Sequence, residues 1–296
     1  MKEMLTIVFR LTLSCILAAT VMGVTFVFTN EAKIHNEHLK EERVAFSLLG
    51  FQDEVPESVE MNTIYRYVVS RGGEQSIGYL LPGGEQASSP FVFLEIDLNG
   101  NLAAQSDVDI DREKVREDKE RDSAIASAIG PGKDFRLAEK FQTITDDGER
   151  AAYLLSGKFP GFKTHIAVML ALRTDFTLIG FEVLEHEEDP GLGAEIEQPF
   201  FKNQFKGKPY EVIKGLDVVK APIPTDYMEA LEMDLPPEDI AQVMEKYRGQ
   251  DIYALTGATI STVAVTDGIK AMVRKFAYRI NILDSVVDTQ NISVSF

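Results

Sequence analysis

Residues Leu11 to Thr29 form a run without a single charged side chain, LTLSCILAATVMGVTFVFT. Nineteen residues in a helix span roughly 28 Å, which is close to the ~30 Å hydrocarbon core of a bilayer. We therefore predict a transmembrane helix over residues 11–29 that lies in the lipid bilayer. Residues 30–296 then fold on one side of the membrane.

Two alternatives to a retained anchor fit this run less well. A cleaved signal peptide has a shorter apolar region and a small-x-small cleavage site, and no such site follows the run before Lys33. A lipoprotein signal needs a large aliphatic residue three positions before Cys15, where Thr12 stands. Lys2 and Arg10 precede the run, so the positive-inside rule predicts a cytoplasmic tail over residues 1–10 and a main domain on the extracytoplasmic, periplasmic side.

Charge and cysteine content exclude several classes of function. The 296 residues carry 47 acidic and 30 basic side chains, and the net charge of −17 disfavours binding to nucleic acid. Cys15 is the single cysteine, so an internal disulfide and a cysteine-ligated zinc or iron–sulfur site are excluded. The four histidines are too few and too scattered for a multi-histidine metal or haem site. We expect no bound metal, and any redox chemistry has to come from an organic cofactor.

The chain beyond the apolar run divides into three predicted segments. Residues 30–60 are polar with helically spaced apolar positions, which predicts a helical stalk leaving the membrane. Residues 61–150 form the N-terminal part of the extracytoplasmic domain. Residues 151–296 form its C-terminal part, where the apolar patterns are clearest.

The first of these two parts of the domain mixes strands and turns. Strands are predicted over Ile64 to Val69 and over Phe91 to Leu98. Asn99 and Gly100 follow the second strand, and this pair is a strong signal for a hairpin turn.

Three alternating aspartates raise the possibility of a calcium loop. They are Asp107, Asp109 and Asp111, but the sixth and twelfth positions of such a loop hold an arginine and an aspartate in place of the required glycine and glutamate. The pattern instead favours a charged helix over residues 112–129, capped by Asp109 or Asp111 and ended by a Gly-Pro-Gly turn.

Apolar runs of strand length follow residue 151. The central run, His165 to Leu172, is nearly continuous, which is typical of a strand covered on both faces. Shorter runs flank it at Tyr153 to Ser156 and at Leu178 to Leu184. We therefore predict an α+β fold with a curved, mostly antiparallel sheet and flanking helices.

The turn from Leu255 to Thr262 lies where the final predicted helix begins, because apolar residues recur at helical spacing from Val265 to Ile280. Unpaired amides and the positive end of the helix dipole attract an anion such as phosphate at this point. Gly257 and Ala258 leave room for close approach. Four hydroxyls are candidate ligands of a phosphate group: Thr256, Thr259, Ser261 and Thr262. The alternative is an ordinary helix N-cap formed by Ser261 or Thr262.

A second loop, Glu185-His186-Glu187-Glu188-Asp189-Pro190-Gly191-Leu192-Gly193, comes directly after the last predicted strand. Its proline and two glycines make a tight turn that exposes backbone. Binding residues tend to lie on such loops when a rigid sheet carries them. A solvated acidic turn and a metal site at His186 are the alternatives, and the second lacks a further histidine at ligand spacing.

Both motifs resemble those of one protein family. Thr256-Gly257-Ala258-Thr259 looks like the Ser/Thr-Gly-Ala-Thr flavinylation motif of the FMN-binding subunits of two membrane redox complexes, and the loop resembles the His-x-Glu-Thr-Pro-Gly-Leu-Gly signature of the same subunits. These are the G subunit of the Rnf complex and the C subunit of the sodium-translocating NADH:quinone oxidoreductase. The chain departs from the family pattern at Tyr253, where an aspartate is usual, and at Asp189, where a threonine is usual.

The resemblance implies a cofactor and its contacts. It implies that FMN is attached covalently to Thr259 through a phosphoester bond made by a flavin transferase, within residues 151–296. It also implies that Leu192 gives the isoalloxazine ring an apolar contact, with Gly193 beside it, and that groups around Glu188 and Asp189 approach the ring's edge. An inward-pointing Asp189 carboxylate would lower the potential of the flavin, because it would destabilise the anionic reduced form.

The predicted function is that of an electron-transfer subunit in a membrane-bound, ion-translocating oxidoreductase of the Rnf type, working with other membrane subunits. No nucleophile elbow, P-loop or paired-histidine motif occurs, so we predict no catalytic residue acting on a metabolite. Three alternatives stay open. They are the C subunit of the quinone oxidoreductase, a membrane-tethered sensory module with a loosely bound phosphate ligand, and a structural subunit with a vestigial site.

Overall fold

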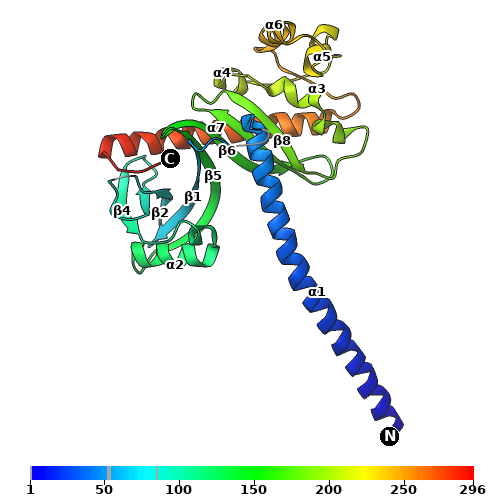
Figure 1. Cartoon of the computed structure of the whole chain (residues 1–296), viewed down its shortest axis with the longest axis vertical. Coiled ribbons are helices and arrows are strands. Elements are labelled where there is room, and N and C mark those ends of the chain that lie inside the picture. Colours follow the sequence, from blue (N-terminus) through cyan, green and yellow to red (C-terminus); the bar gives the residue numbers. More distant parts are fainter. Residues whose placement is uncertain (1, 52–54, 85) are drawn as a thin grey trace. The chain divides into compact units, whose positions relative to one another are not determined.

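The computed structural model describes residues 2–51, 55–84 and 86–296 (Figure 1). The chain divides into two compact units, Met1–Ser47 and Leu48–Phe296. The first unit consists of helix α1 (Lys2–Leu49), which continues into the start of the second. Within α1, the stretch Thr6–Phe26 is long and apolar enough to cross a membrane, by length and composition. The predicted span and the first part of the predicted stalk therefore belong to one continuous helix, and residues 52–54 of that stalk lie outside the described residues.

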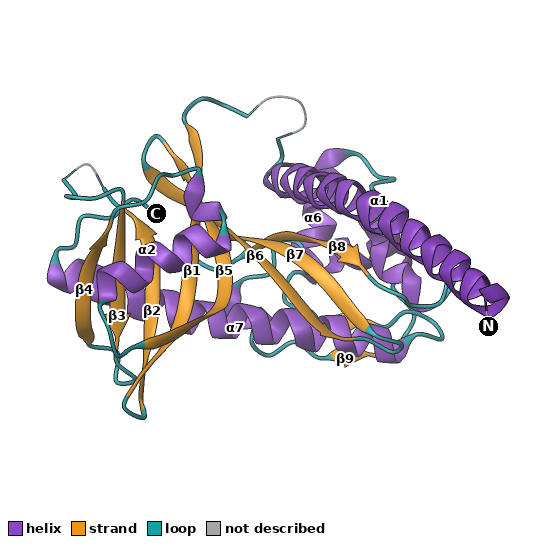
Figure 2. Ribbon diagram, turned by 90° about the horizontal axis from the view of Figure 1, so that it is seen from below, coloured by secondary structure: helices purple, strands orange, loops and turns teal. Residues whose placement is uncertain are grey.

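The second unit is built on one antiparallel sheet of eight strands in the order β4-β3-β2-β1-β5-β6-β7-β8 (Figure 2). Each half of the sheet is a meander of four strands, and β1 and β5 join the halves at its centre. The strands are β1 (Val59–Arg71), β2 (Glu74–Pro82), β3 (Phe91–Ile96), β4 (Leu102–Val108), β5 (Asp134–Asp146), β6 (Glu149–Pro160), β7 (His165–Arg173) and β8 (Leu178–Glu185). An α+β fold with an antiparallel sheet and flanking helices is thus confirmed.

Helix α7 (Thr259–Gln290) packs along one face of the sheet and completes the main core. Its buried side chains, such as Val273 and Leu283, share this core with residues from β1, β2, β3, β5, β6, β7 and β8. Each fully buried aliphatic or aromatic side chain contributes about 1.5–3 kcal/mol to this packing. The helix therefore ties both meanders together.

Helix α2 (Asp118–Ile129) covers the opposite face of the first meander (Figure 1). Successive residues of β3 point to opposite sides, so Val92 and Leu94 join the core under α7, whereas Phe91 and Phe93 join the core under α2. A short 3₁₀ helix, η1 (Lys114–Arg116), precedes α2. The predicted aspartate cap is wrong, because the N-cap of α2 is Glu117 and its side chain makes no capping hydrogen bond.

The strands predicted from the sequence are confirmed. Four of them are longer than predicted, whereas β3 ends at Ile96, two residues before the predicted end at Leu98. The nearly continuous run at 165–172 is strand β7, and all of its residues from Ile166 to Leu172 are buried. Asn99 and Gly100 lie in the turn between β3 and β4, where Gly100 adopts a φ of 86°. The boundary expected at residue 150 falls inside the β5–β6 hairpin, where Thr145 pairs with Arg150.

Between β8 and α7 the chain forms short elements that lie beside the second meander. They are η2 (Gly193–Glu197), α3 (Pro199–Lys202), η3 (Asn203–Phe205), α4 (Tyr210–Ile213), β9 (Val218–Val219), α5 (Thr225–Leu231), α6 (Pro237–Tyr247) and β10 (Ile252–Tyr253). Strands β9 and β10 form a two-stranded parallel pair that leads directly into the turn before α7.

Candidate functional site

The turn that precedes α7 is closed by its own hydrogen bonds. The hydroxyl Oγ1 of Thr262 accepts a hydrogen bond from the backbone N–H of Leu255 and donates one to the carbonyl of Ala258, both at 3.1 Å. Gly257 has a φ of 76°, in the left-handed region that side chains rarely adopt. The turn is therefore held in one shape before α7 starts at Thr259.

The four candidate hydroxyls fall into two pairs. Those of Ser261 and Thr262 are buried and bonded to protein groups, so they serve the fold of the turn. Thr256 is exposed and Thr259 is half-buried. Among the described residues, the hydroxyl of Thr259 has no hydrogen-bond partner.

The first turn of α7 lacks a side-chain cap. The alternative of an N-cap by Ser261 or Thr262 is not found, because the N-cap position is taken by Ala258, whose side chain offers no acceptor. The amides at the helix start therefore keep their donor capacity, next to the positive end of the dipole of a 32-residue helix. This arrangement suits a phosphate group.

A buried carboxylate joins this turn to two other segments. Oε2 of Glu188 accepts a hydrogen bond from the hydroxyl of Ser261, and Oε1 accepts from the amides of Phe162, at 2.8 Å, and Lys163, at 3.3 Å. The residue is only 5% exposed, and burying a charge without such partners would be costly. Glu188 therefore fixes the β6–β7 turn, the loop after β8 and the start of α7 to one another.

Glycines allow the segments around Glu188 to approach one another closely. A Cβ on Gly193 would lie 2.6 Å from Oε2 of Glu188 and 2.7 Å from Oγ of Ser261. A Cβ on Gly161 would lie 2.5 Å from Oε1 of the same glutamate. At Gly257 it would lie 3.0 Å from Cδ2 of Leu192. The two sequence motifs, far apart in the chain, are thus packed directly against each other.

Each of the three segments that Glu188 joins carries one exposed apolar side chain. Phe162 is 57% exposed, Leu192 is 45% exposed and Ile260 is 59% exposed. Large apolar side chains that gather at the surface commonly mark a binding site. The sequence prediction included Leu192 but missed Phe162 and Lys163, although Gly161 beside them is a signal for close approach of the backbone.

The rest of the loop after β8 is held by polar contacts. The His186 Nδ1 accepts a hydrogen bond from the amide of Glu188 at 3.0 Å, and its Nε2 lies 3.1 Å from the carboxylate of Glu197. Asp189 pairs with Lys163 at 2.5 Å, and this hydrogen bond raises the pKa of Lys163. No group of three or more histidine, cysteine or acidic side chains in the described ranges is placed to hold a metal.

The backbone of Tyr253, one of the departures from the family pattern, is held by two hydrogen bonds. The buried side chain of Gln204 accepts a hydrogen bond from the Tyr253 amide at 2.8 Å and donates one to its carbonyl at 3.3 Å. The ring of Tyr253 packs against that of Tyr227 in α5, with centroids 6.1 Å apart. The nearest acid in the sequence, Asp251, accepts a hydrogen bond from the amide of Asp217 at 3.0 Å. Both residues thus position the strand pair that leads into the turn.

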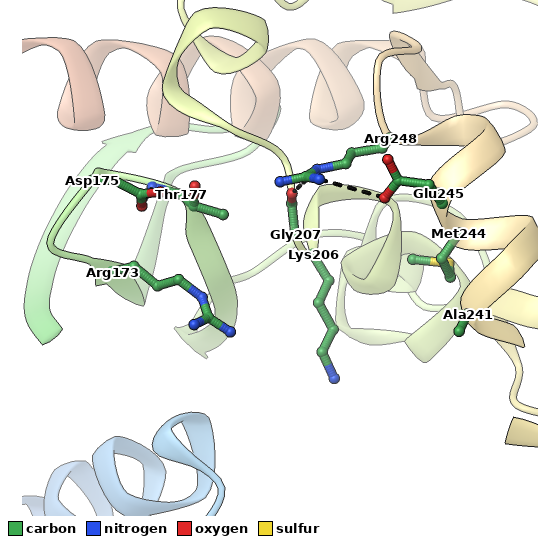
Figure 3. A pocket seen from close by; sticks show the side chains of 9 residues that line it. All are labelled: Arg173, Asp175, Thr177, Lys206, Gly207, Ala241, Met244, Glu245 and Arg248. Atoms are coloured by element: carbon green, nitrogen blue, oxygen red, sulfur yellow. Dashed lines mark hydrogen bonds and ion pairs between the residues drawn. The ribbon is translucent and has the colours of Figure 1, made fainter. Parts of the chain in front are cut away.

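A separate open pocket of about 390 Å³ lies between the β7–β8 turn, the segment before α4 and helix α6 (Figure 3). Arg248 in this pocket donates to the carbonyl of Gly207 at 2.9 Å and pairs with Glu245 at 3.4 Å. Its lining contains no residue of either sequence motif. The lining residues are Arg173, Asp175, Thr177, Lys206, Gly207, Ala241, Met244, Glu245 and Arg248.

Comparison with known proteins matches the FMN-binding domain to residues 161–274, which include both motifs and the β6–β7 turn. A relative from Clostridium ljungdahlii, the G subunit of the proton-translocating ferredoxin:NAD(+) oxidoreductase complex, is 28% identical over 59% of this chain and 76% of its own length. The G subunit of the Na(+)-translocating ferredoxin:NAD(+) oxidoreductase complex of Acetobacterium woodii is 27% identical over 51% of this chain and 61% of its own.

One further relative and one solved structure are also similar. The G subunit of the ion-translocating oxidoreductase complex of Methanosarcina acetivorans is 29% identical over 45% of this chain and 55% of its own length. The crystal structure of Shewanella oneidensis NqrC aligns over 80% of this chain and 91% of its own, with 16% identity and a TM-score of 0.44.

Proposed function

Because the chain belongs to the family of FMN-binding subunits of ion-translocating membrane redox complexes, we propose that it is an electron-transfer subunit of the Rnf type. We propose that its FMN is bonded to Thr259 through a phosphoester. The names of the curated relatives, each a G subunit, favour the Rnf type over the quinone oxidoreductase type.

The observation that carries this proposal is the placement of Thr259. Its hydroxyl is half-buried, stands at the first position of α7, and has no hydrogen-bond partner within the described part of the chain. The neighbouring hydroxyls of Ser261 and Thr262 are already bonded to the protein. A phosphate ester at Thr259 would meet the uncapped amides of the helix start, which stabilise its negative charge.

The surroundings fit the remainder of FMN. Phe162, Leu192 and Ile260 offer exposed apolar surface for an aromatic ring beside the turn. Bound FMN supplies a group that exchanges electrons singly or in pairs, while the protein sets position and electrostatics. In this chain the position is set by Glu188, whose hydrogen bonds hold all three segments that carry these side chains. A rigid frame of this kind keeps a cofactor in one orientation toward its partners.

The membrane topology is part of the proposal. The single apolar stretch in α1 fits a membrane anchor, and the few basic residues before it favour a cytoplasmic N-terminus. The cofactor domain would then face the extracytoplasmic side, next to other membrane subunits of the complex. A covalent link suits this location, because an exported protein cannot easily recover a lost cofactor.

A substitution at the attachment site tests the covalent bond. The full chain is produced in a host that contains a flavin transferase, and the variants Thr259→Ala and Thr259→Ser are compared with the unchanged protein. We expect a fluorescent band on a denaturing gel, and a peptide mass raised by FMN less one water, for the unchanged protein and for Thr259→Ser. Thr259→Ala should lose both signals while remaining folded.

Three results would point elsewhere. A fluorescent Thr259→Ala band would place the bond on another residue. Flavin that leaves the unchanged protein on acid precipitation would favour a module with a loosely bound phosphate ligand. Colourless protein of unmodified mass from the competent host would favour a structural subunit without a cofactor.

A further inference from the structure

An ion pair stands beside the candidate site. Nζ of Lys163 and Oδ1 of Asp189 are 2.5 Å apart, and both side chains are about half exposed. Lys163 lies in the β6–β7 turn, and its amide donates to Oε1 of the buried Glu188 at 3.3 Å. Asp189 directly follows Glu188 in the loop after β8. The backbones that carry the two charges are therefore fixed by the same buried carboxylate.

The pair is connected to the turn that carries Thr259. The carbonyl of Asp189 accepts hydrogen bonds from the amides of Leu192, at 3.1 Å, and Ala194, at 3.0 Å. These bonds form the tight turn that brings Leu192 against Gly257. The loop that contains Asp189 thus packs against the turn that leads into Thr259.

The charges around the pair indicate its role. Asp189 is the last of three successive carboxylates, Glu187, Glu188 and Asp189, in the loop after β8. Glu187 and Glu188 add further negative charge nearby and, with Asp189, raise the pKa of Lys163, chiefly through the hydrogen bond to Asp189. Lys163 is the cation that faces this cluster.

Resting on the proposed function, we infer that the Lys163–Asp189 pair sets the redox potential of the bound flavin. The lysine compensates the charge of Asp189, so that reduction of the flavin is not opposed by an unpaired negative charge. Lys163 and Asp189 are thus positioning residues that act on the flavin through charge.

The sign of the effect follows from the charge that reduction adds. Two electrons and one proton convert the neutral oxidised ring into the anionic reduced ring, so the site gains one negative charge. Loss of the lysine leaves an unpaired carboxylate, which disfavours the reduced form and lowers the potential. Loss of the carboxylate leaves an unpaired cation, which raises the potential.

The expected shift of the redox potential is small because the side chains of Lys163 and Asp189 both reach solvent. A unit charge about 10 Å away in a medium between protein surface and water changes the ratio of reduced to oxidised flavin roughly two- to tenfold. A tenfold change in that equilibrium corresponds to about 30 mV for a two-electron couple. The effect should shrink at high salt, since exposed charges are screened.

The experiment is a double-mutant cycle on the flavin-loaded full chain. Lys163→Met, Asp189→Thr and the double variant are titrated by spectroelectrochemistry at low and at high salt. We expect a lower midpoint potential for Lys163→Met, a higher one for Asp189→Thr, and a value near that of the unchanged protein for the double variant. Both single shifts should diminish at high salt.

A second ion pair provides a matched control. Lys246 and Asp226 connect α6 and α5 with a distance of 2.7 Å and comparable exposure of both side chains. Neither residue belongs to the three segments that Glu188 joins. Lys246→Met and Asp226→Thr should leave the midpoint potential unchanged.

The outcomes separate this inference from the proposed function. Flavin absorbance retained in all variants, with potentials equal to that of the unchanged protein, would overturn the inference and leave the proposed function standing. Shifts of the same sign in both single variants, independent of salt, would show a structural effect and would also overturn it. Colourless unchanged protein would overturn both.

Discussion

Two buried charged side chains, Arg121 beside the first half of the sheet and Glu188 beside the second, have different roles. In the first meander, Arg121 of α2 is 1% exposed and donates to the hydroxyl of Tyr67 at 2.6 Å and to the carbonyl of Val115 at 3.1 Å. Its guanidinium also lies 4.2 Å from the ring centroid of Tyr65. Beside the second meander, Glu188 accepts hydrogen bonds from Phe162 and Lys163 in the β6–β7 turn and from Ser261 in the first turn of α7.

Arg121 lies in a closed core, whereas Glu188 lies next to exposed residues of the candidate site. Tyr67 and Val115, two partners of Arg121, belong to the core covered by α2, and its third partner, Asp118, lies in the first turn of α2 itself, so this charge serves stability. The partners of Glu188 are residues of the candidate site, either with exposed side chains or close in the chain to Thr259. The match to the FMN-binding domain, residues 161–274, includes Glu188 but not Arg121. Of these two buried charges, only Glu188 joins the segments that carry the sequence motifs.

Removing each buried charge should separate stability from cofactor loading. Arg121→Ala leaves buried polar partners without a donor and should lower the free energy of unfolding by about 3 kcal/mol, without loss of attached flavin in the protein that folds. Glu188→Ala should lower it by a similar amount and also abolish flavin attachment. Urea unfolding and flavin absorbance per protein measure the two effects. Equal loading in both folded variants would contradict the comparison.

A pair of glycine substitutions tests the same separation of stability from cofactor loading. A Cβ on Gly78 of β2 would lie 2.3 Å from the ring of Phe93, and a Cβ on Gly193 would lie 2.6 Å from Glu188. Each alanine should therefore cost up to about 3 kcal/mol of stability through overpacking. Only Gly193→Ala should reduce flavin loading, because it alone displaces the loop after β8. Thermal unfolding and fluorescence on a denaturing gel report the two quantities, and loss of flavin in Gly78→Ala would remove the distinction.

The buried Lys208, between β8 and α7, predicts that the stability of the protein depends on pH. Burial lowers the pKa of Lys208 to about 8, although its ammonium donates to carbonyls at the end of α6. The unfolded chain keeps this proton up to about pH 10.4, so it binds more protons than the folded protein above pH 8. The stability contribution of Lys208 should thus rise between about pH 8 and pH 10, by at most about 2 kcal/mol.

This contribution can be isolated with a variant. Lys208→Met should remove the rise when urea unfolding is measured in steps across this range. Buried tyrosines such as Tyr67 have raised pKa values and lower stability above about pH 10, because the unfolded chain then loses protons that the folded protein keeps. The same rise in Lys208→Met as in the unchanged protein would assign it to another group.

The sequence predicted the parts of the fold that depend on local pattern. The continuous apolar run indicated β7, the Asn-Gly pair indicated the turn after β3, and helical spacing after Thr262 indicated α7. The start of α2 was not predictable from its aspartates, because the buried Arg121 bonds back to Asp118 and to the carbonyl of Val115 and so fixes the first turn. Such contacts depend on tertiary packing, which periodicity does not encode.

The candidate site was predictable only in part for the same reason. The motifs around Thr259 and Glu188 were visible in the sequence, but the hydrogen bond between Glu188 and Ser261 joins residues 73 positions apart. That bond helps to divide the four hydroxyls into buried and available ones. Phe162 and Lys163 belong to the site only because β6 and β7 deliver their turn to the same carboxylate.

The packing of α7 along both meanders has a consequence for how the protein matures. The helix that starts at Thr259 also supplies the side chains that close the main core, so the eight strands cannot complete that core before these residues leave the ribosome. The turn before Thr259 therefore reaches its folded shape only after α7 has been synthesised. Any event that depends on this shape has to follow the synthesis of that helix.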